Sequence, residues 1–557
     1  MAQPRPESQV LYMAPELALS EDAARERFAW VIEPQKSDGG ESKIFYAERY
    51  GGIGMGSHGG GARCGYDGEK FQLKGIGPNP LVGVIDADSL KQSNGELTLA
   101  SALYEMVWSR ILQQCLPYGV NACLAVLALP DSVISGQSRA LLVRELLIRP
   151  AHFERAAAFR HPRPSPIAER SQDVRRVAAM CNHLAPILQA TYSLDTVKAA
   201  QVVPAGLCQF ACRQAHQLAF AQSHFLYHSL SSSNFSVDGK WLDFTATSPL
   251  NPAGIFSAQG MDSAWLSLWD QDSIIVDVLY SLVMHYSKYQ HLSDATKQHW
   301  IEKIITTFKD ELHQASALYL LQMAGVPAPI AKKIAAEAVS IDWAHALIEV
   351  LKILPVYLCT DEQELISLVD LTFSATARAD WPKSFIQQEA VQRYLQFRVQ
   401  VWQLILMTAQ ALDISEHHLR IGMTLSAIKR TQKPDYFSYH GMMNEIETTL
   451  KQHEDYATDR WQLLTHSLRQ CCDALVESGV FYMTYEAGLD VVCWQEDGYR
   501  LIYHIENYDF SVEYDKRRVS ISRSQLNKMS NSYPFLNSCL DFYRHHRAEQ
   551  YMNGEVG

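Results

Sequence analysis

The spacing of hydrophobic positions changes along the chain and predicts several kinds of structure. The segment Phe71–Lys74 alternates as a strand does, and Phe28–Ile32 is a second short strand candidate. The runs 122–129 and 140–148 are continuously apolar, which is typical of buried strands. Between Phe71–Lys74 and these runs, residues 98–116 have the 3.6-residue spacing of an amphipathic helix. Up to about residue 160 the pattern therefore predicts a strand-rich unit with one embedded helix.

A helical spacing dominates from Val174 to about residue 475 and breaks into polar loop and short strand near 224–248. Before it, residues 161–172 hold three prolines in six positions, which predicts a linker. The longest periodic segments lie near 274–290, 298–324, 328–353, 385–412 and 442–478. After Gly479 the pattern predicts an antiparallel β-meander with strands at Val480–Tyr485, Leu489–Trp494, Tyr499–Ile505, Phe510–Tyr514 and Val519–Ser522.

Composition narrows the class of protein. The chain has 557 residues, of which 47% are hydrophobic and 20% charged, as in ordinary globular proteins. The formal net charge of −12 argues against a nucleic-acid partner. No apolar run approaches the ~20 residues of a membrane span, and no secretory signal opens the chain. Eleven cysteines lack framework spacing, so we expect reduced thiols and a cytoplasmic protein.

A glycine-dense segment at 51–61 is the first candidate for chemistry. It contains Gly59, Gly60 and Gly61, and Arg63 follows directly. Glycines let backbone N–H groups approach phosphate oxygens closely. The alternative is a flexible loop without a ligand, because the G-x-G-x-x-G pattern alone is weak and neither a Rossmann nor a Walker context surrounds it.

Charged residues downstream strengthen the nucleotide interpretation. Lys74 on the predicted strand and Glu105 on the predicted helix suit an ion pair that supports a phosphate-binding lysine; both could instead be solvated surface residues. Arg144 and Arg149 lie at the end of an apolar strand, where a guanidinium needs an anionic partner. That partner is either a triphosphate or a nearby glutamate, Glu145 or Glu154.

The loop after His228 holds the candidate metal ligands. Asn234 and Asp243 flank a short hairpin and could jointly hold Mg²⁺, although they could also shape a turn and cap one. Cys208, Cys212 and His216 recur at helical spacing, but they match no standard zinc site and read more simply as one side of a buried helix.

Three short motifs resemble the SelO family of kinase-fold protein adenylyltransferases. Leu73-Lys-Gly-Ile-Gly-Pro-Asn-Pro80 is close to that family's Leu-Lys-Gly-Ala-Gly-Pro-Thr-Pro, Arg149-Pro-Ala-His-Phe-Glu154 to its Arg-Phe-Gly-His-Phe-Glu, and Asn234-Phe-Ser-Val to its Asn-Met-Ser-Ile. The matched region spans about residues 46–250. In that family ATP is bound inverted relative to true kinases, so that AMP is transferred.

The resemblance implies a fold and roles for individual residues. The fold is α+β and bilobal, like a protein kinase: an N-terminal segment (1–48), an N-lobe with the glycine-rich loop (49–160), a helical C-lobe with the catalytic and metal loop (161–478), the meander (479–525) and a tail (526–557). The implied roles are an ion pair of Lys74 with Glu105, phosphate contacts from Arg144 and Arg149, and Mg²⁺ ligands at Asn234 and Asp243. ATP and Mg²⁺ are the implied cofactors.

One departure bears on the acceptor. The family has an Asp directly before the metal-binding Asn, but this chain has Ser233. A hydroxyl acceptor needs a base, whereas a carboxylate acceptor is already deprotonated at pH 7. The chain also looks similar to the maturation proteins of siderophore-peptide microcins, which implies adenylation of a peptide C-terminus and an acyltransferase-like partner.

The sequence therefore predicts an ATP- and Mg²⁺-dependent nucleotidyltransferase acting on a protein or peptide. A catalytically inactive scaffold that stabilises a partner enzyme is the alternative, favoured by Ser233, and a γ-phosphate kinase is a third possibility.

Overall fold

The computed structural model describes most of the chain, and the account below concerns those residues. They are 2–32, 41–52, 55, 60–61, 63–78, 94–132, 136–160, 167–250, 262–355, 368–373, 381–431, 433–452, 460–496, 498–522, 525–526 and 528–529.

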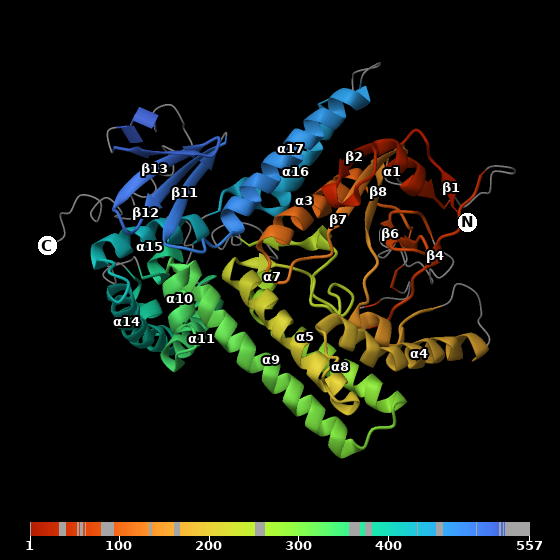
Figure 1. Ribbon diagram of the computed structural model, residues 1–557, viewed down its shortest axis with the longest axis horizontal. Coiled ribbons are helices and arrows are strands. Elements are labelled where there is room, and N and C mark those ends of the chain that lie inside the picture. Colours follow the sequence, from red (N-terminus) through yellow and green to blue (C-terminus); the bar gives the residue numbers. More distant parts are fainter. Residues whose placement is uncertain are drawn as a thin grey trace.

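An antiparallel six-stranded sheet forms the N-terminal part of the molecule (Figure 1). The two long strands pair at its centre because their apolar runs are buried on both faces. In spatial order the strands are β2 (Gln9–Met13), β7 (Cys123–Ser132), β8 (Ser138–Glu145), β6 (Phe71–Lys74), β5 (Cys64–Tyr66) and β4 (Tyr46–Ala47). The strands predicted at 71–74, 122–129 and 140–148 are thus confirmed.

The predicted embedded helix is α3 (Leu99–Cys115), and it covers one face of this sheet. The Thr98 side chain caps it by accepting a hydrogen bond from the backbone of Ser101 at 3.2 Å. The other face is covered by α1 (Glu21–Phe28) and its surroundings, where Phe28 packs edge-on against Phe71. The strand predicted at 28–32 is shorter than expected, because Phe28 ends this helix and only β3 (Trp30–Val31) is extended, paired with β1 (Gln3–Pro4).

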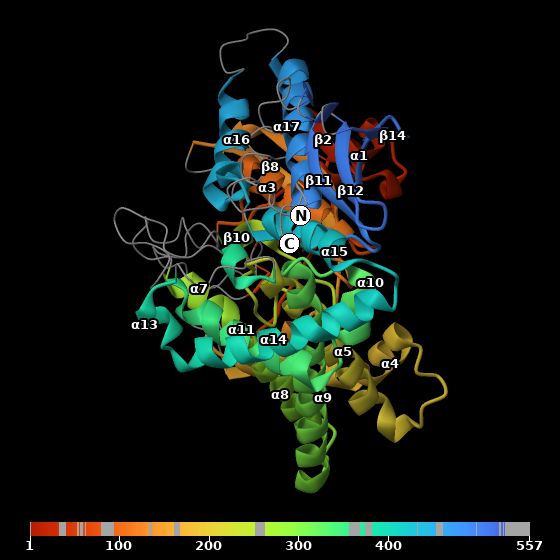
Figure 2. The same ribbon diagram turned by 90° about the vertical axis from the view of Figure 1, so that its left-hand side faces the viewer.

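The region after the sheet is mainly helical, as the sequence predicts (Figures 1 and 2). Its helices α5, α8 and α9 pack on one another below the sheet. The helices are α4 (Ile167–Tyr192), α5 (Ala199–Ser223), α7 (Asp262–Trp269), α8 (Asp272–Tyr289), α9 (Asp294–Met323), α10 (Ala328–Ile334), α11 (Ala338–Ile353), α13 (Lys383–Ile386), α14 (Glu389–Gln410), α15 (Glu416–Thr431), α16 (Tyr439–Lys451) and α17 (Arg460–Met483).

The linker predicted at 161–172 is wrong over its second half, because α4 already begins at Ile167. The three prolines at 162–166 precede the helix, so they do not interrupt it, and residues 161–166 lie outside the described part of the chain. The segment expected as one helix at 328–353 is two helices, α10 and α11.

The C-terminal meander is confirmed, with one fewer strand than predicted. It consists of β11 (Asp490–Glu496), β12 (Tyr499–His504), β13 (Asp509–Tyr514) and β14 (Arg517–Ile521), paired in sequence order. The strand expected at Val480–Tyr485 is wrong, because α17 continues to Met483. Packing explains the difference: a Cβ added at Gly479 would lie 2.2 Å from Ile111 of α3, so the two helices approach closely, and Met483 is fully buried.

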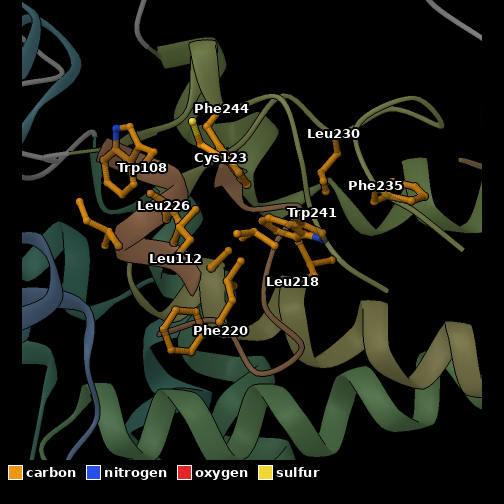
Figure 3. Packing of buried hydrophobic residues seen from close by; sticks show 14 of the residues in the cluster. Trp108, Leu112, Cys123, Leu218, Phe220, Leu226, Leu230, Phe235, Trp241 and Phe244 are labelled. Carbon is orange, nitrogen blue, oxygen red and sulfur yellow. The ribbon is translucent and has the colours of Figure 1, made fainter. Parts of the chain in front are cut away.

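A continuous apolar core joins the sheet side to the helical side (Figure 3). Trp108 and Leu112 of α3 meet Leu218 of α5 in this cluster. Trp241 and Phe244 enter it from the loop that connects two short paired strands, β9 (Leu226–Tyr227) and β10 (Ser248–Pro249). The loop that carries Asp243 is therefore rooted in the core on both sides of that residue. None of the helices in the described ranges combines the length and apolar character that crossing a bilayer requires.

Candidate functional site

A cavity of about 560 Å³ lies between the edge of the N-terminal sheet and the helical half. Residues far apart in sequence line it, and they come from the glycine-rich segment, β6, β8, the 229–246 loop and α8. Its polar lining includes the cations Arg63, Lys74 and Arg144, the carboxylates Glu154, Asp243 and Asp277, and the amide of Asn234.

Lys74 is the centre of the charged wall. It stands on β6, and its side chain is only 2% exposed. Its Nζ donates to Glu105 Oε2 at 2.7 Å and to Asp243 Oδ1 at 2.5 Å. The pair predicted between Lys74 and Glu105 is present, and the solvated-surface alternative for both residues is wrong. Asp243 is a second partner, from the 229–246 loop.

Arg144 extends this network on the neighbouring strand β8. Its Nη1 donates to Glu105 Oε1 at 3.1 Å, so both oxygens of that carboxylate are occupied. Its Nε donates to Gln72 Oε1 at 2.7 Å. The anionic partner within the protein is therefore Glu105, whereas the candidate partner Glu145 pairs with Lys70 instead. Arg144 also lines the cavity, so the predicted phosphate contact remains a prediction.

Asp243 sits in a constrained position. Its backbone is left-handed, with φ of 68°, directly before the 3₁₀ turn Phe244–Ala246, and a non-glycine residue held there is typical of functional loops. Burial opposes ionisation of its carboxyl group, but Lys74, Arg144 and Arg63 outweigh burial and hold its pKa far below the usual range. Asp243 is consequently an ionised oxygen donor at the cavity wall.

Asn234 lies in the same wall and is fixed by its neighbours. Its Nδ2 donates to the carbonyl of Ser229 at 2.5 Å, and its Oδ1 accepts from Ser233 Oγ at 3.2 Å. The backbone N–H of Leu242, next to Asp243, donates to the carbonyl of Asn234 at 3.0 Å. The structure thus brings the two predicted metal ligands to one end of the loop.

The glycine-rich segment contributes Gly60 and Gly61 to the cavity wall, together with Arg63. Gly61 has φ of +79°, and a Cβ there would lie 2.4 Å from the carbonyl oxygen of Glu48. At Gly60 a Cβ would meet the Tyr50 ring at 2.2 Å. Close packing therefore already requires glycine at both positions. Gly59, the third predicted contact, lies outside the described residues.

Arg149 differs from the expectation in its surroundings. It is 2% exposed and, in the part of the chain that the structure describes, does not line the cavity. Its Nη1 donates to the carbonyl of Ser233 at 2.9 Å and to Tyr50 Oη at 3.2 Å. The candidate partner Glu154 instead accepts from Ser232. Arg149 thus holds the loop beside Asn234 from behind, and its predicted phosphate contact stays untested.

Several residues of the site escaped the sequence analysis. Glu48 is buried beside Arg149 and His152. Burial opposes its ionisation, yet the charge of Arg149 and the hydrogen bond with His152 lower its pKa to about 2. Asp277 reaches the cavity from α8, and Thr245 from the 3₁₀ turn. No local motif marks them, because only the folded chain brings these three separate segments together. The spacing of Ile274, Asp277 and Val278 on one helical face was the available signal.

The donor set fits a magnesium ion. Asn234 Oδ1 and the Asp243 carboxylate are hard oxygen ligands, and Mg²⁺ commonly takes only one or two protein ligands and completes its shell with phosphates and water. No cluster of three or more histidine, cysteine or acidic side chains suited to a metal occurs within the described ranges. His216 pairs with Glu311 at 2.8 Å, so its spacing with Cys208 and Cys212 forms no metal site there.

The chain was also compared with known proteins. Neither a scan against protein-family models nor a search of curated protein sequences returned a match.

Proposed function

We propose that this protein is an ATP- and Mg²⁺-dependent nucleotidyltransferase that transfers AMP to a protein or peptide. The observation that carries the proposal is the double pairing of Lys74 with Glu105 and Asp243 at the wall of a 560 Å³ cavity. A buried lysine held between two carboxylates, in the same cavity wall as the Asn234 amide oxygen, offers both a cation for phosphate oxygens and ligands for a metal ion.

In this proposal each residue has one task. Lys74, held in place by Glu105, binds phosphate oxygens, and Arg144 and Arg63 add positive charge to the same wall. Asn234 and Asp243 would hold Mg²⁺, which when bound neutralises developing charge on the phosphates. Arg149 keeps the Ser233 carbonyl, and with it the loop, in position. The bilobal, kinase-like arrangement belongs to the same proposal.

AMP rather than γ-phosphate transfer is favoured by the motifs around Lys74, Arg149 and Asn234, which resemble those of SelO adenylyltransferases. Two acceptor groups are compatible with it. One is a side-chain hydroxyl. The other is a peptide C-terminal carboxylate, activated for attachment of a siderophore as in microcin maturation, with an acyltransferase-like partner.

A catalytically inactive scaffold is the second candidate, and one observation favours it. Arg144 and Arg149 donate hydrogen bonds to other protein groups, and Arg144 is paired with Glu105. Part of the positive charge that a triphosphate would need is therefore already neutralised within the protein. A scaffold of this kind would bind and stabilise a partner enzyme.

Labelled ATP separates these functions. The full-length protein is incubated with Mg²⁺ and a peptide array, once with ATP labelled at the α-phosphate and once at the γ-phosphate. Acceptor labelled only from the α-position, with pyrophosphate released, is the expected result. Transfer of the γ-label would identify a kinase, and no labelled acceptor under either condition would leave the scaffold.

A further inference from the structure

Helix α8 forms one wall of the cavity, and no sequence motif predicted this. Ile274, Asp277 and Val278 line it, and their i, i+3, i+4 spacing places them on one face of the helix. The adjacent face carries Ile275, Leu279 and Leu282 into the core. Two apolar side chains and one carboxylate thus face the same space as Asn234 and Asp243.

The helix is fixed relative to the candidate metal loop. Gln271, the residue that precedes α8, is buried, and its Nε2 donates to the carbonyl of His228, where that loop begins. His228 is itself buried, stacked on Trp241 and hydrogen-bonded through Nδ1 to Thr247 Oγ1 at 2.8 Å. Asp277 is therefore carried by an element tied to the loop, which fixes its backbone position relative to Asn234 and Asp243.

The three carboxylates at the cavity differ in their partners. Asp243 is bound to Lys74 and accepts from Thr245 at 3.3 Å, and Glu154 accepts from Ser232 at 2.5 Å. Asp277 is exposed and has no hydrogen bond or ion pair with any other described residue. Of these three groups it is the one whose oxygens are available to accept a proton from a molecule in the cavity.

We propose that Asp277 is the general base of the reaction and that the acceptor is a hydroxyl group. The proposal rests on the nucleotidyltransferase function above. The loop has Ser233 where the SelO family has an Asp, and in this proposal α8 supplies the missing carboxylate. Ile274 and Val278 would contact the apolar part of the acceptor residue on either side of the base.

The step balances as follows. The acceptor oxygen forms a bond to the α-phosphorus of ATP while its proton passes to a carboxylate oxygen of Asp277. The bond between the α-phosphorus and the bridging oxygen breaks, and its electron pair leaves with pyrophosphate. A carboxylate acceptor has no proton to give and would meet the like charge of Asp277, so this wall disfavours it.

The experiment uses the full-length protein, ATP labelled at the α-phosphate, Mg²⁺ and two peptide sets. One set carries a single Ser, Thr or Tyr and an amidated C-terminus; the other lacks hydroxyls and has a free C-terminal carboxylate. We expect label on the hydroxyl set. Asp277→Asn should lower kcat for it by about 10²–10³-fold with little change in the KM for ATP.

Chemical rescue distinguishes a base from a positioning residue. Formate should raise the transfer rate of Asp277→Ala by about tenfold or more, because a small carboxylate can occupy the vacated space. It should not raise the transfer rate of Asp243→Ala. Asp310→Asn, an exposed aspartate on α9 away from the cavity, is the matched control and should behave as wild type.

Three results would overturn the proposal while the nucleotidyltransferase function stands: labelling of the carboxylate set alone, a loss below about threefold in Asp277→Asn, or a loss that formate does not repair. If the unaltered protein labels neither set, the nucleotidyltransferase function fails and the role of Asp277 fails with it.

Discussion

Two buried charge clusters lie in different parts of this molecule, and each is built around a lysine. The first joins Lys74 to Glu105 and Asp243, with Arg144 on the far side of Glu105. The second joins Lys429 and Arg430, at the end of α15, to the single carboxylate of Glu486, with Lys429 Nζ 2.6 Å from Glu486 Oε1. Both are almost inaccessible to solvent at the lysine.

The clusters differ in what surrounds them. The first opens onto a cavity of about 560 Å³, whereas the space beside Arg430 and Glu486 measures about 10 Å³. In the second, Arg430 also donates to the carbonyl of Thr484 at 2.8 Å and stacks over Tyr485, which ties α15 to the segment leading into the meander. A buried ion pair alone is therefore poor evidence for a functional site. What distinguishes such a site is a cavity that a ligand can enter and polar atoms that can still bind it.

The largest expected effect is that of Lys74→Met. Removing the ammonium takes away the phosphate-binding charge, so AMP transfer per folded molecule should fall by about 10³-fold. It also removes the cation that Glu105 and Asp243 share, leaving Asp243 without an ion pair and Glu105 with Arg144 alone, and should lower the free energy of unfolding by about 3–5 kcal/mol. Transfer is measured with labelled ATP and folding by circular dichroism. Lys429→Met is the matched control: stability should fall, but transfer per folded molecule should not. An equal loss of transfer per folded molecule in both variants would show that the two clusters do not differ in function.

Asp243→Asn should have the next largest effect. The amide keeps the shape but removes the charge that would hold Mg²⁺, so transfer should fall by about 10²-fold and the Mg²⁺ concentration for half-maximal rate should rise. A magnesium titration at saturating ATP measures both quantities. An unchanged magnesium requirement would show that Asp243 is not a ligand.

Arg149→Lys should have a smaller effect. A lysine cannot bond to Ser233, Tyr50 and Gln72 together, so the loop shifts; we expect kcat to fall about tenfold with the KM for ATP little changed. Steady-state kinetics separates the two parameters. A raised KM for ATP with normal kcat would instead support the phosphate contact predicted from the sequence.

Glu486→Gln should leave transfer per folded molecule unchanged and affect stability alone. Burial opposes ionisation of Glu486, but Arg430 and Lys429 lower its pKa from 4.5 to about 2. A carboxyl group with a depressed pKa stabilises the fold fully above its unfolded value, and this contribution of about 3 kcal/mol disappears as the pH falls from about 4.5 toward 2.

Urea unfolding of Glu486→Gln and the unaltered protein at pH 7 and at pH 3 tests this sign. The stability difference between the two proteins should be largest at pH 7 and shrink at pH 3. A difference that grows in acid would mean that the cluster does not hold Glu486 ionised.

The sequence by itself determined the elements whose patterns are local. The strand with Lys74, the helix with Glu105, the two central strands and the four strands of the meander all follow from spacing that is decided within a few residues. The Lys74–Glu105 pair could be predicted because each residue lies on an element that local spacing predicts and because the two side chains carry opposite charges.

Tertiary structure decided what depends on contacts between distant segments. Packing of α17 against α3 kept Val480–Met483 helical although its composition favours a strand. Arg149 turned toward Ser233, and Asp277 reached the cavity, because a side chain's surroundings are set by whichever elements pack beside it. Local spacing shows which face of a helix a carboxylate occupies; only the assembled fold shows what that face meets.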